Sequence, residues 1–222
     1  PATVAAISHE LDVAILQLHD DSFFIKGKAL SLGDIPDIHQ EVLVYGYPVG
    51  GDTLSTTRGI VSRIEYLPYS HSGLSYEMIQ IDAAVNAGNS GGPALANGTV
   101  VGIVMQKADG DGENIGYIIP STMVKRFLAD LNDGKYDGFP AFSAQIEPLL
   151  NPTLKKKHQL TDAQTGILLT RICANTNAEK VLQVSDVITH IDGKPIDDDG
   201  TTLLTNHKTI YFLHYVDTHQ LG

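Results

Sequence analysis

The chain has 222 residues, of which 42% are hydrophobic, and a formal net charge of −11, so it can bury a sizeable core. The acidic balance argues against a nucleic-acid-binding protein, and no apolar run approaches the roughly 20 residues of a membrane-spanning helix. Cysteine and histidine spacings indicate neither a metal site nor a cofactor.

The first predicted elements are two apolar runs with a polar interruption between them. Ala2–Ile7 is the first run, and Asp12–Leu18 reads as a buried strand that opens with an acid. On composition alone, Asp12 is a turn or strand-capping aspartate. His9 lies in the interruption, where we expect a surface position. The chain begins at Pro1 without an initiator Met or a signal peptide, so we expect a fragment that has lost its targeting information.

Strands are predicted next between residues 29 and 65. Ala29–Asp34 reads as a strand and turn, and Val42–Pro48 as a strand that ends in a glycine-containing loop. Thr53–Ile64 alternates and is rich in β-branched residues, as barrel strands are. Tyr66–Tyr76 is polar and contains glycine, so the sequence predicts a loop there.

A tight glycine turn, Ala84–Pro93, lies between the apolar runs Met78–Ile81 and Val100–Val104. It contains Ser90, whose hydroxyl would be exposed. Glycines allow positive φ and bring backbone N–H groups close to that hydroxyl. A nucleophile beside such donors meets the needs of acyl transfer. The competing interpretation is a glycine-rich hairpin in a β protein.

The clearest helix in the sequence follows a predicted strand, Ile115–Pro120. Ser121–Leu131 has apolar residues at helical spacing, with Ser121 or Thr122 as the predicted cap and Gly134 at its end. Residues 134 to 138 read as a linker.

The remaining sequence reads as a separate small domain. Gly166–Ile172 is a predicted strand, Ala178–Leu182 a short helix, and Asp186–Ile196 two strands joined by an Asp-Gly turn. The single cysteine, Cys173, cannot form an internal disulfide, and we expect a buried, inert thiol.

Several of these strings carry a resemblance to one family. Gly-Asn-Ser-Gly-Gly-Pro at 88–93 and Asp-Val-Ala-Ile-Leu at 12–16 resemble segments of chymotrypsin-fold serine proteases of the HtrA/Deg branch. The strings at 46–55 and 59–65 are similar to the plant-type Deg proteases. The resemblance implies that Ser90 is the nucleophile, that Asp12 orients a histidine, and that the N–H groups of Gly88 and Ser90 form the oxyanion hole.

The fold implied is mostly β: a chymotrypsin-like double β-barrel over residues 1–134, whose N-terminal barrel is incomplete. Triad order in this fold is His, Asp, Ser, and His9 is too close to Asp12 to serve. We therefore expect the catalytic histidine outside this chain. The resemblance also places Val85, Asn86, Val104 and Gln106 at the substrate pocket, with a preference for small-to-medium apolar residues. The alternative for Val104 is an ordinary core position. The loop at 66–76 corresponds to one that senses activating ligands in the family, but it lacks the arginine used by bacterial members.

Residues 139–222 resemble a C-terminally truncated PDZ-like α+β domain, on the strings Asp-Val-Ile at 186–188 and Gly-Lys-Pro-Ile at 193–196. Such domains bind an extended peptide by strand addition. The implied carboxylate loop contains Phe139, Ala141 and Phe142, and the implied groove helix is Thr209–Val216. Pro140 removes one backbone donor from that loop.

The function implied is an ATP-independent HtrA/Deg-type serine endopeptidase that degrades unfolded or damaged proteins. It would need no metal or cofactor and would bind no nucleic acid. The full-length protein would be a homotrimer or a multiple of trimers. The alternative is a non-catalytic peptide-binding scaffold with a protease-like body. A catalytic histidine in the full-length protein would support the enzyme, and its replacement by another residue would support the scaffold.

Overall fold

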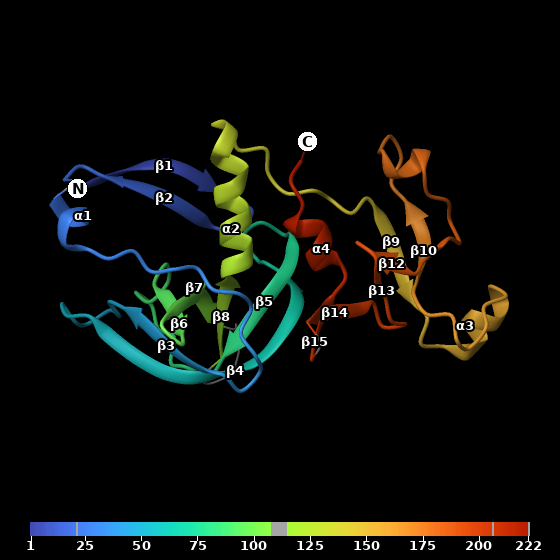
Figure 1. Ribbon diagram of the computed structural model, residues 1–222, viewed down its shortest axis with the longest axis horizontal. Coiled ribbons are helices and arrows are strands. Elements are labelled where there is room, and N and C mark those ends of the chain that lie inside the picture. The colour runs from blue at the N-terminus through green and yellow to red at the C-terminus, as the bar shows by residue number, and fades with distance from the viewer. Residues whose placement is uncertain (21, 108–114, 206, 222) are drawn as a thin grey trace. The chain divides into compact units, whose positions relative to one another are not determined.

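The computed structural model describes residues 1–20, 22–107, 115–205 and 207–221, and strands dominate its described part (Figure 1). The chain divides into two compact units. The first contains Pro1–Phe139 together with Gln220–Gly222, and the second contains Pro140–His219. The first unit holds a barrel, a hairpin and the long helix α2.

A closed barrel of six strands forms the body of the first unit. Its order is β3-β4-β5-β8-β7-β6. The strands are β3 (Glu41–Gly46), β4 (Ser55–Pro68), β5 (Ser75–Ile81), β6 (Pro93–Ala96), β7 (Thr99–Lys107) and β8 (Gly116–Pro120). The structure confirms the predicted strands at 42–48, 53–64, 78–81, 100–104 and 115–120. It adds β6, so the glycine turn leads into a short strand before β7.

Paired strands of the barrel bury β-branched side chains. Ile79 lies opposite Ile118, and Val61 lies opposite Ile81. All four side chains are buried, with exposed fractions of 0%. Alternation along each strand sends these residues inward, and their burial contributes about 2 kcal/mol each.

The predicted loop at 66–76 is shorter than the sequence suggests. β4 continues to Pro68, and Tyr66 and Leu67 pair with Glu77 and Tyr76 of β5. The loop is reduced to residues 69–74. The expectation was wrong because β-branched and aromatic side chains favour continued strand pairing over a polar loop.

A hairpin outside the barrel carries the N-terminal segment. β1 (Ala2–Ser8) pairs with β2 (Val13–Leu18) as a separate two-stranded sheet. Leu11 and Val13 are buried in a cluster that also contains Tyr69 and Met105 from the barrel strands and their loops. Packing of its turn therefore anchors the hairpin to the barrel. His9 is exposed, as expected.

The segment between hairpin and barrel differs from its prediction. This segment begins with a short helix, α1 (Ser22–Lys26). Residues 29–34 do not form a strand, because Leu32 makes only a single parallel bridge with Val100. A Cβ at Gly33 would lie 2.7 Å from Thr99 Oγ1, so a side chain there would displace that of Thr99.

The predicted helix is α2 (Ser121–Asp130), followed by the 3₁₀ turn η1 (Leu131–Asp133). Neither predicted cap is used: Pro120 is the N-cap, and the Ser121 hydroxyl donates to the Val100 carbonyl at 2.5 Å. Gly134 adopts φ +86° and ends the segment, as predicted. The helix packs Met123 and Phe127 into the same cluster as the hairpin turn.

The second unit contains short sheets and short helices. The elements are β9 (Ala144–Pro148), α3 (Pro152–Lys157), β10 (Ile167–Ile172), η2 (Ala178–Lys180), β11 (Val187–Ile188), β12 (His190–Ile191), β13 (Lys194–Pro195), β14 (Thr201–Thr205), β15 (Lys208–Tyr211) and α4 (Leu213–Thr218). One sheet has the order β11-β10-β9, so β9 lies at its edge. Ile167, Ile196 and Phe212 form the core.

In the second unit, the predicted Asp-Gly turn is present, but the predicted helix at 209–216 starts later than expected. Asp192 and Gly193 both have positive φ between β12 and β13, as a two-residue hairpin turn requires. The predicted helix Thr209–Val216 is wrong at its start, because Thr209 and Ile210 pair with β14. The helix begins at Leu213. Cys173 is exposed, which corrects the expected buried thiol.

Candidate active site

Ser90 lies in a tightly folded loop between β5 and β6. The Asn89 N–H donates to the Asn86 carbonyl at 3.0 Å, and the Gly92 N–H donates to the Asn89 carbonyl at 2.9 Å. These two consecutive turns leave the Ser90 side chain exposed while Asn89 is buried. The geometry expected of an exposed serine in a glycine turn is present.

Backbone hydrogen bonds tie this loop to strand β7 and to the loop that follows β3. Gly91 donates to Val104 at 2.8 Å, and Val104 donates back to Gly92 at 2.9 Å. On the other side, the Val49 N–H donates to the Ala87 carbonyl at 2.9 Å. Because both flanks are fixed, the position of Ser90 is set by the barrel rather than by the loop alone.

Two glycines allow the Ser90 loop to lie close to the backbone of Tyr45 and Tyr47. Gly88 has φ +99°, and a Cβ there would lie 2.2 Å from the Tyr47 carbonyl oxygen. A Cβ at Gly92 would lie 2.1 Å from the Tyr45 carbonyl oxygen. Both distances are far below any non-bonded contact, so the sequence motif has a steric cause.

The backbone N–H groups of Gly88 and Ser90 face no protein acceptor. Within the described ranges, neither group donates a hydrogen bond to the chain. Both residues are exposed, so these N–H groups are open to solvent. Two such donors flanking an exposed serine hydroxyl are available to a ligand oxygen.

The four residues predicted to line the substrate pocket have different environments. Val85 is buried against Gly116, where an added Cβ would lie 2.5 Å from Val85 Cγ2. Val104 is 1% exposed, which fits the core alternative, and Asn86 is exposed. The side chain of Gln106 lies outside the described residues.

Asp12 lies in the turn between β1 and β2, with φ +57° and an exposed side chain. Its Oδ2 atom accepts a hydrogen bond from the Tyr69 hydroxyl at 2.6 Å. In the part of the chain that the structure describes, no other bond to this carboxylate is present, and none joins it to Ser90. The sequence places Tyr69 in the predicted loop at 66–76 and gives no signal for this contact.

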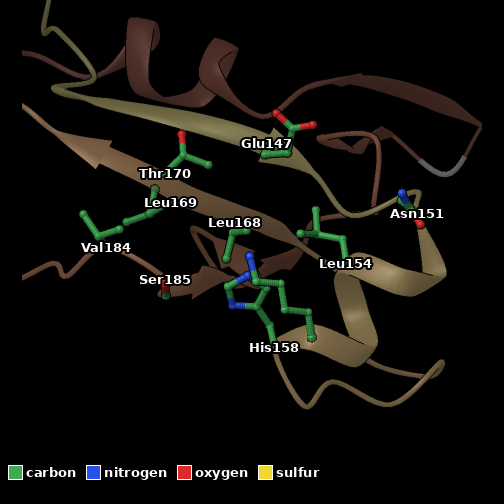
Figure 2. Close-up of a pocket in the computed structure, with 10 residues that line it drawn as sticks. Glu147, Asn151, Leu154, His158, Leu168, Leu169, Thr170, Val184 and Ser185 are labelled. Atoms are coloured by element: carbon green, nitrogen blue, oxygen red, sulfur yellow. The ribbon is translucent and has the colours of Figure 1, made fainter.

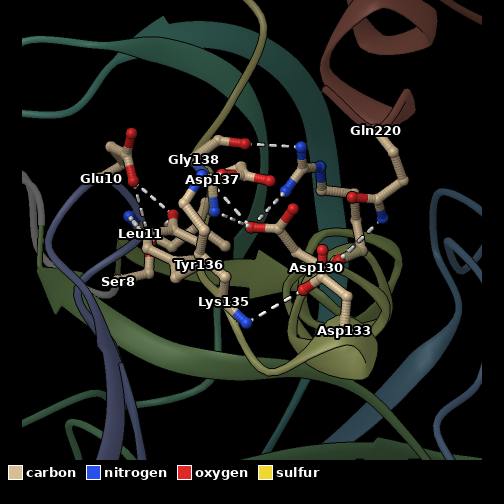
Figure 3. A network of polar contacts seen from close by, with 11 residues as sticks. Ser8, Glu10, Leu11, Asp130, Asp133, Lys135, Tyr136, Asp137, Gly138 and Gln220 are labelled. Atoms are coloured by element: carbon tan, nitrogen blue, oxygen red, sulfur yellow. Dashed lines mark hydrogen bonds and ion pairs between the residues drawn. The ribbon is translucent and has the colours of Figure 1, made fainter. Parts of the chain in front are cut away.

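A polar network holds the turn that contains Asp12 (Figure 3). The Leu11 N–H donates to Ser8 Oγ at 3.3 Å, and Ser8 Oγ lies 2.6 Å from the Tyr136 hydroxyl. Tyr136 also donates to the Glu10 carboxylate. Glu10, which directly precedes Leu11, is thereby fixed to a residue that follows α2.

The same figure shows how residues 135–138 are fastened to α2. Asp130 Oδ2 accepts from the N–H groups of Asp137 and Gly138 at 2.9 and 3.2 Å. The guanidinium group of Arg126 donates to the Gly138 carbonyl. Residues predicted to be a free linker are thus part of the first unit, because their backbone groups bond to buried side chains of α2.

Two histidines lie near Asp12 in space. The His9 and His71 rings are 6.1 Å apart, and the His71 ring is 6.1 Å from the Tyr69 ring. Among the described residues, neither imidazole hydrogen-bonds to Asp12 or to Ser90. Neither histidine therefore connects the two predicted triad members.

The residues of the predicted carboxylate loop are divided between the two units. Phe139 belongs to the first unit, where its ring lies under the Arg126 guanidinium at 4.4 Å. Ala141 is exposed, and the Phe142 ring packs edge-on against Phe212 at 5.5 Å in the second unit. Phe142 therefore lies beside the residue that precedes α4.

The second unit has a pocket that the sequence did not predict (Figure 2). Its volume is about 470 Å³, and it lies between α3 and the β9–β10 sheet. The lining residues are Glu147, Asn151, Leu154, Lys157, His158, Leu168, Leu169, Thr170, Val184 and Ser185. Ser185, at one edge of the pocket lining, has φ +79°.

The described residues contain neither a metal-binding cluster nor a membrane-spanning helix. No group of three or more His, Cys, Asp or Glu side chains is placed to hold a metal ion. No described helix combines the length and apolar composition needed to cross a bilayer.

Comparisons with known proteins identify the relatives of this chain. A family model described as a trypsin-like peptidase domain matches residues 1–103. Protease Do-like 4, mitochondrial, of Arabidopsis thaliana is 40% identical over 221 residues, which cover 99% of this chain and 42% of that protein. This chain belongs to the HtrA/Deg family of serine proteases. Its greater similarity to a plant member is also as predicted: the Bacillus subtilis serine protease Do-like HtrA is 32% identical over 209 residues, or 84% of this chain and 44% of that protein.

Solved structures of HtrA/Deg proteins have the same fold. The HtrA-type protease AlgW with a tripeptide superposes with a TM-score of 0.68 at 23% identity, over 94% of this chain and 74% of that one. This confirms the mostly β, trypsin-like fold. This HtrA/Deg chain spans 42% of the length of the Arabidopsis relative.

Proposed function

We propose that the protein carrying this chain is an ATP-independent serine endopeptidase that cleaves unfolded or damaged proteins. The single observation that carries the proposal is the Ser90 loop. It presents an exposed hydroxyl beside two N–H donors without protein acceptors. In the proposed mechanism, those donors bind the oxyanion that forms when a serine attacks a peptide carbonyl.

Asp12 and a histidine complete the proposed mechanism. Ser90 attacks the carbonyl carbon while the imidazole takes its proton. The imidazole then protonates the leaving amine, and water releases the acyl group by the reverse sequence. Asp12 orients the imidazole and stabilises its charged form. Because His9 and His71 connect to neither Asp12 nor Ser90, we assign the base to a histidine outside this chain.

Substrate selection is proposed to involve both units. Val85, Asn86, Val104 and Gln106 would form the side-chain pocket, with a preference for small-to-medium apolar residues. Residues 139–222, which include the second unit, would act as a PDZ-like peptide-binding domain. Support comes from the edge position of β9, where an extended peptide could add as a further strand. The full-length protein is proposed to be a homotrimer or a multiple of trimers.

The test is proteolysis of casein by the full-length protein that contains this chain and its histidine. Ser90→Ala should lower the rate by about 10⁴ or more without changing the melting temperature, because the side chain is exposed. Ser31→Ala, an exposed serine in the same unit, is the matched control. Unchanged proteolysis by the Ser90→Ala protein would overturn the assignment. A wild-type protein that binds casein without cleaving it would favour the scaffold alternative.

A further inference from the structure

Tyr69 is hydrogen-bonded to the Asp12 carboxylate, although the two residues are 57 positions apart in the sequence. The Tyr69 hydroxyl donates to Asp12 Oδ2 at 2.6 Å, a short bond typical of a charged acceptor. Tyr69 lies at the end of the β4–β5 hairpin, and Asp12 lies at the turn of the β1–β2 hairpin. The contact thus joins two hairpins that are otherwise separate sheets.

The ring of Tyr69 is fixed independently of this bond. It is 5% exposed and packs in the cluster that contains Leu11 and Val13, the two neighbours of Asp12. Its N–H donates to the Leu74 carbonyl at 2.8 Å, and its carbonyl accepts from Gly73 at 2.8 Å. A buried ring on a closed turn can direct its hydroxyl with little freedom, whereas Asp12 itself is exposed.

The remaining carboxylate oxygen of Asp12 is available for a second donor. In the described part of the chain, Oδ1 accepts no hydrogen bond. A carboxylate that orients an imidazole must hold one oxygen toward the ring N–H, and a hydrogen bond to its other oxygen limits rotation of the carboxylate plane away from that position. The bond from Tyr69 to Oδ2 supplies that restraint. Burial and the bond to Asp12 raise the pKa of Tyr69 to about 12, so the phenol stays a donor at neutral pH.

We propose that Tyr69 is a positioning residue for catalysis, which holds Asp12 Oδ2 so that Oδ1 faces the catalytic histidine. This rests on the proposed function, because it takes Asp12 as the triad carboxylate. Tyr69 does not touch the substrate. Its loss should reduce turnover and leave substrate binding unchanged, since it acts only through the orientation of Asp12.

A matched control lies in the same hairpin. Tyr76 is equally buried, at 2% exposed, and its ring is 6.2 Å from that of Tyr69. Its hydroxyl donates to Met105 Sδ at 3.3 Å rather than to Asp12. Tyr69→Phe and Tyr76→Phe each remove one hydroxyl from the same cluster, so a general effect on packing should appear in both.

The experiment compares these variants in the full-length protein, with Asp12→Asn and Ser90→Ala alongside. Peptide cleavage gives kcat and KM, and the rate of Ser90 modification by a fluorophosphonate reports nucleophile activation without a peptide pocket. Tyr69→Phe should lower kcat and the modification rate about tenfold with KM unchanged. Tyr76→Phe should leave all three unchanged. A variant that melts near the assay temperature is measured at 10 °C.

The possible failures are distinguishable. If Asp12→Asn and Ser90→Ala lose activity while Tyr69→Phe behaves like Tyr76→Phe, the positioning role is wrong and the proposed function stands. If Tyr69→Phe raises KM and leaves kcat unchanged, Tyr69 acts on binding and the inference is also overturned. If Asp12→Asn retains the wild-type rate, the proposed triad is wrong, and the role of Tyr69 fails with it.

Discussion

A side chain on Gly88 would begin where the Tyr47 carbonyl oxygen already lies, since a Cβ there would be 2.2 Å from that oxygen. Gly88→Ala should therefore displace the Ser90 loop. We expect a loss of about 3 kcal/mol in the free energy of unfolding, and peptidase activity at least 100-fold lower in the full-length protein. Urea unfolding and peptide cleavage measure the two effects.

Gly91 provides the control for that substitution. It also has positive φ, but a Cβ there would meet open space. Gly91→Ala should cost only the backbone strain, about 1–2 kcal/mol. Equal destabilisation by the two substitutions would show that φ, and not the contact with Tyr47, makes Gly88 necessary.

The buried ion pair of α2 should contribute strongly to stability. Arg126 and Asp130 have side-chain exposures of 2% and 3%, and Asp130 also accepts two backbone N–H groups. Asp130→Ala should lower the free energy of unfolding by about 3–5 kcal/mol, because it leaves a buried guanidinium without its anion. Asp34→Ala breaks the exposed pair with Lys125 and should cost less than about 1 kcal/mol. Similar losses in urea unfolding would contradict this ranking.

The second unit should lose stability in mild acid. Burial lowers the pKa of His214 from its usual 6.5 to about 4. Between these values the unfolded chain binds the proton and the folded unit does not. The stabilisation is therefore complete above pH 6.5 and is lost as the pH falls toward 4, by on the order of 3 kcal/mol.

Urea unfolding of the second unit's transition at pH 7 and pH 4.5 tests this dependence. His214→Phe should flatten the pH dependence, whereas His190→Phe, at an exposed position, should leave it as in wild type. A wild-type slope retained in the His214→Phe chain would mean that other groups cause the acid sensitivity.

The 222-residue chain by itself should not cleave casein. Without an imidazole base, a serine hydroxyl is a poor nucleophile at neutral pH, and the loss of one triad member costs about 10⁴ in rate. Incubation of the purified chain with labelled casein checks this. Cleavage that Ser90→Ala abolishes would instead place the base within the chain, and His71→Ala and His9→Ala would then identify it.

Local sequence patterns were sufficient for most barrel strands and for the glycine turn. Burial of Ile79 and Ile118 follows from apolar periodicity, and Gly88 and Gly92 are required by close contacts with the backbone at Tyr45 and Tyr47. These features depend on neighbours in sequence or on one hydrophobic pattern. Family resemblance supplied the roles of Ser90 and Asp12, which spacing alone left open.

Features that depend on specific hydrogen-bond partners were missed. The Ser121 hydroxyl bonds to Val100 instead of capping its helix, and Thr209 continues a strand because β14 is there to pair with it. Residues 135–138 read as a linker, yet Asp130 binds their N–H groups. The Tyr69–Asp12 bond spans 57 positions and has no local signature. Apolar periodicity carries no signal for any of these hydrogen bonds, and for Ser121 and Tyr69 the partners lie 21 and 57 positions away.

The exposed thiol of Cys173 makes the chain easy to tag at one position. It is the single cysteine of the sequence, so a maleimide fluorophore would attach with one-to-one stoichiometry to the folded protein. The Cys173 N–H donates to the Ser143 carbonyl at 2.9 Å, beside the loop proposed to receive a peptide carboxylate. The dye's emission would then report titration of that loop with peptides, and the same signal would follow unfolding of the second unit separately from the barrel.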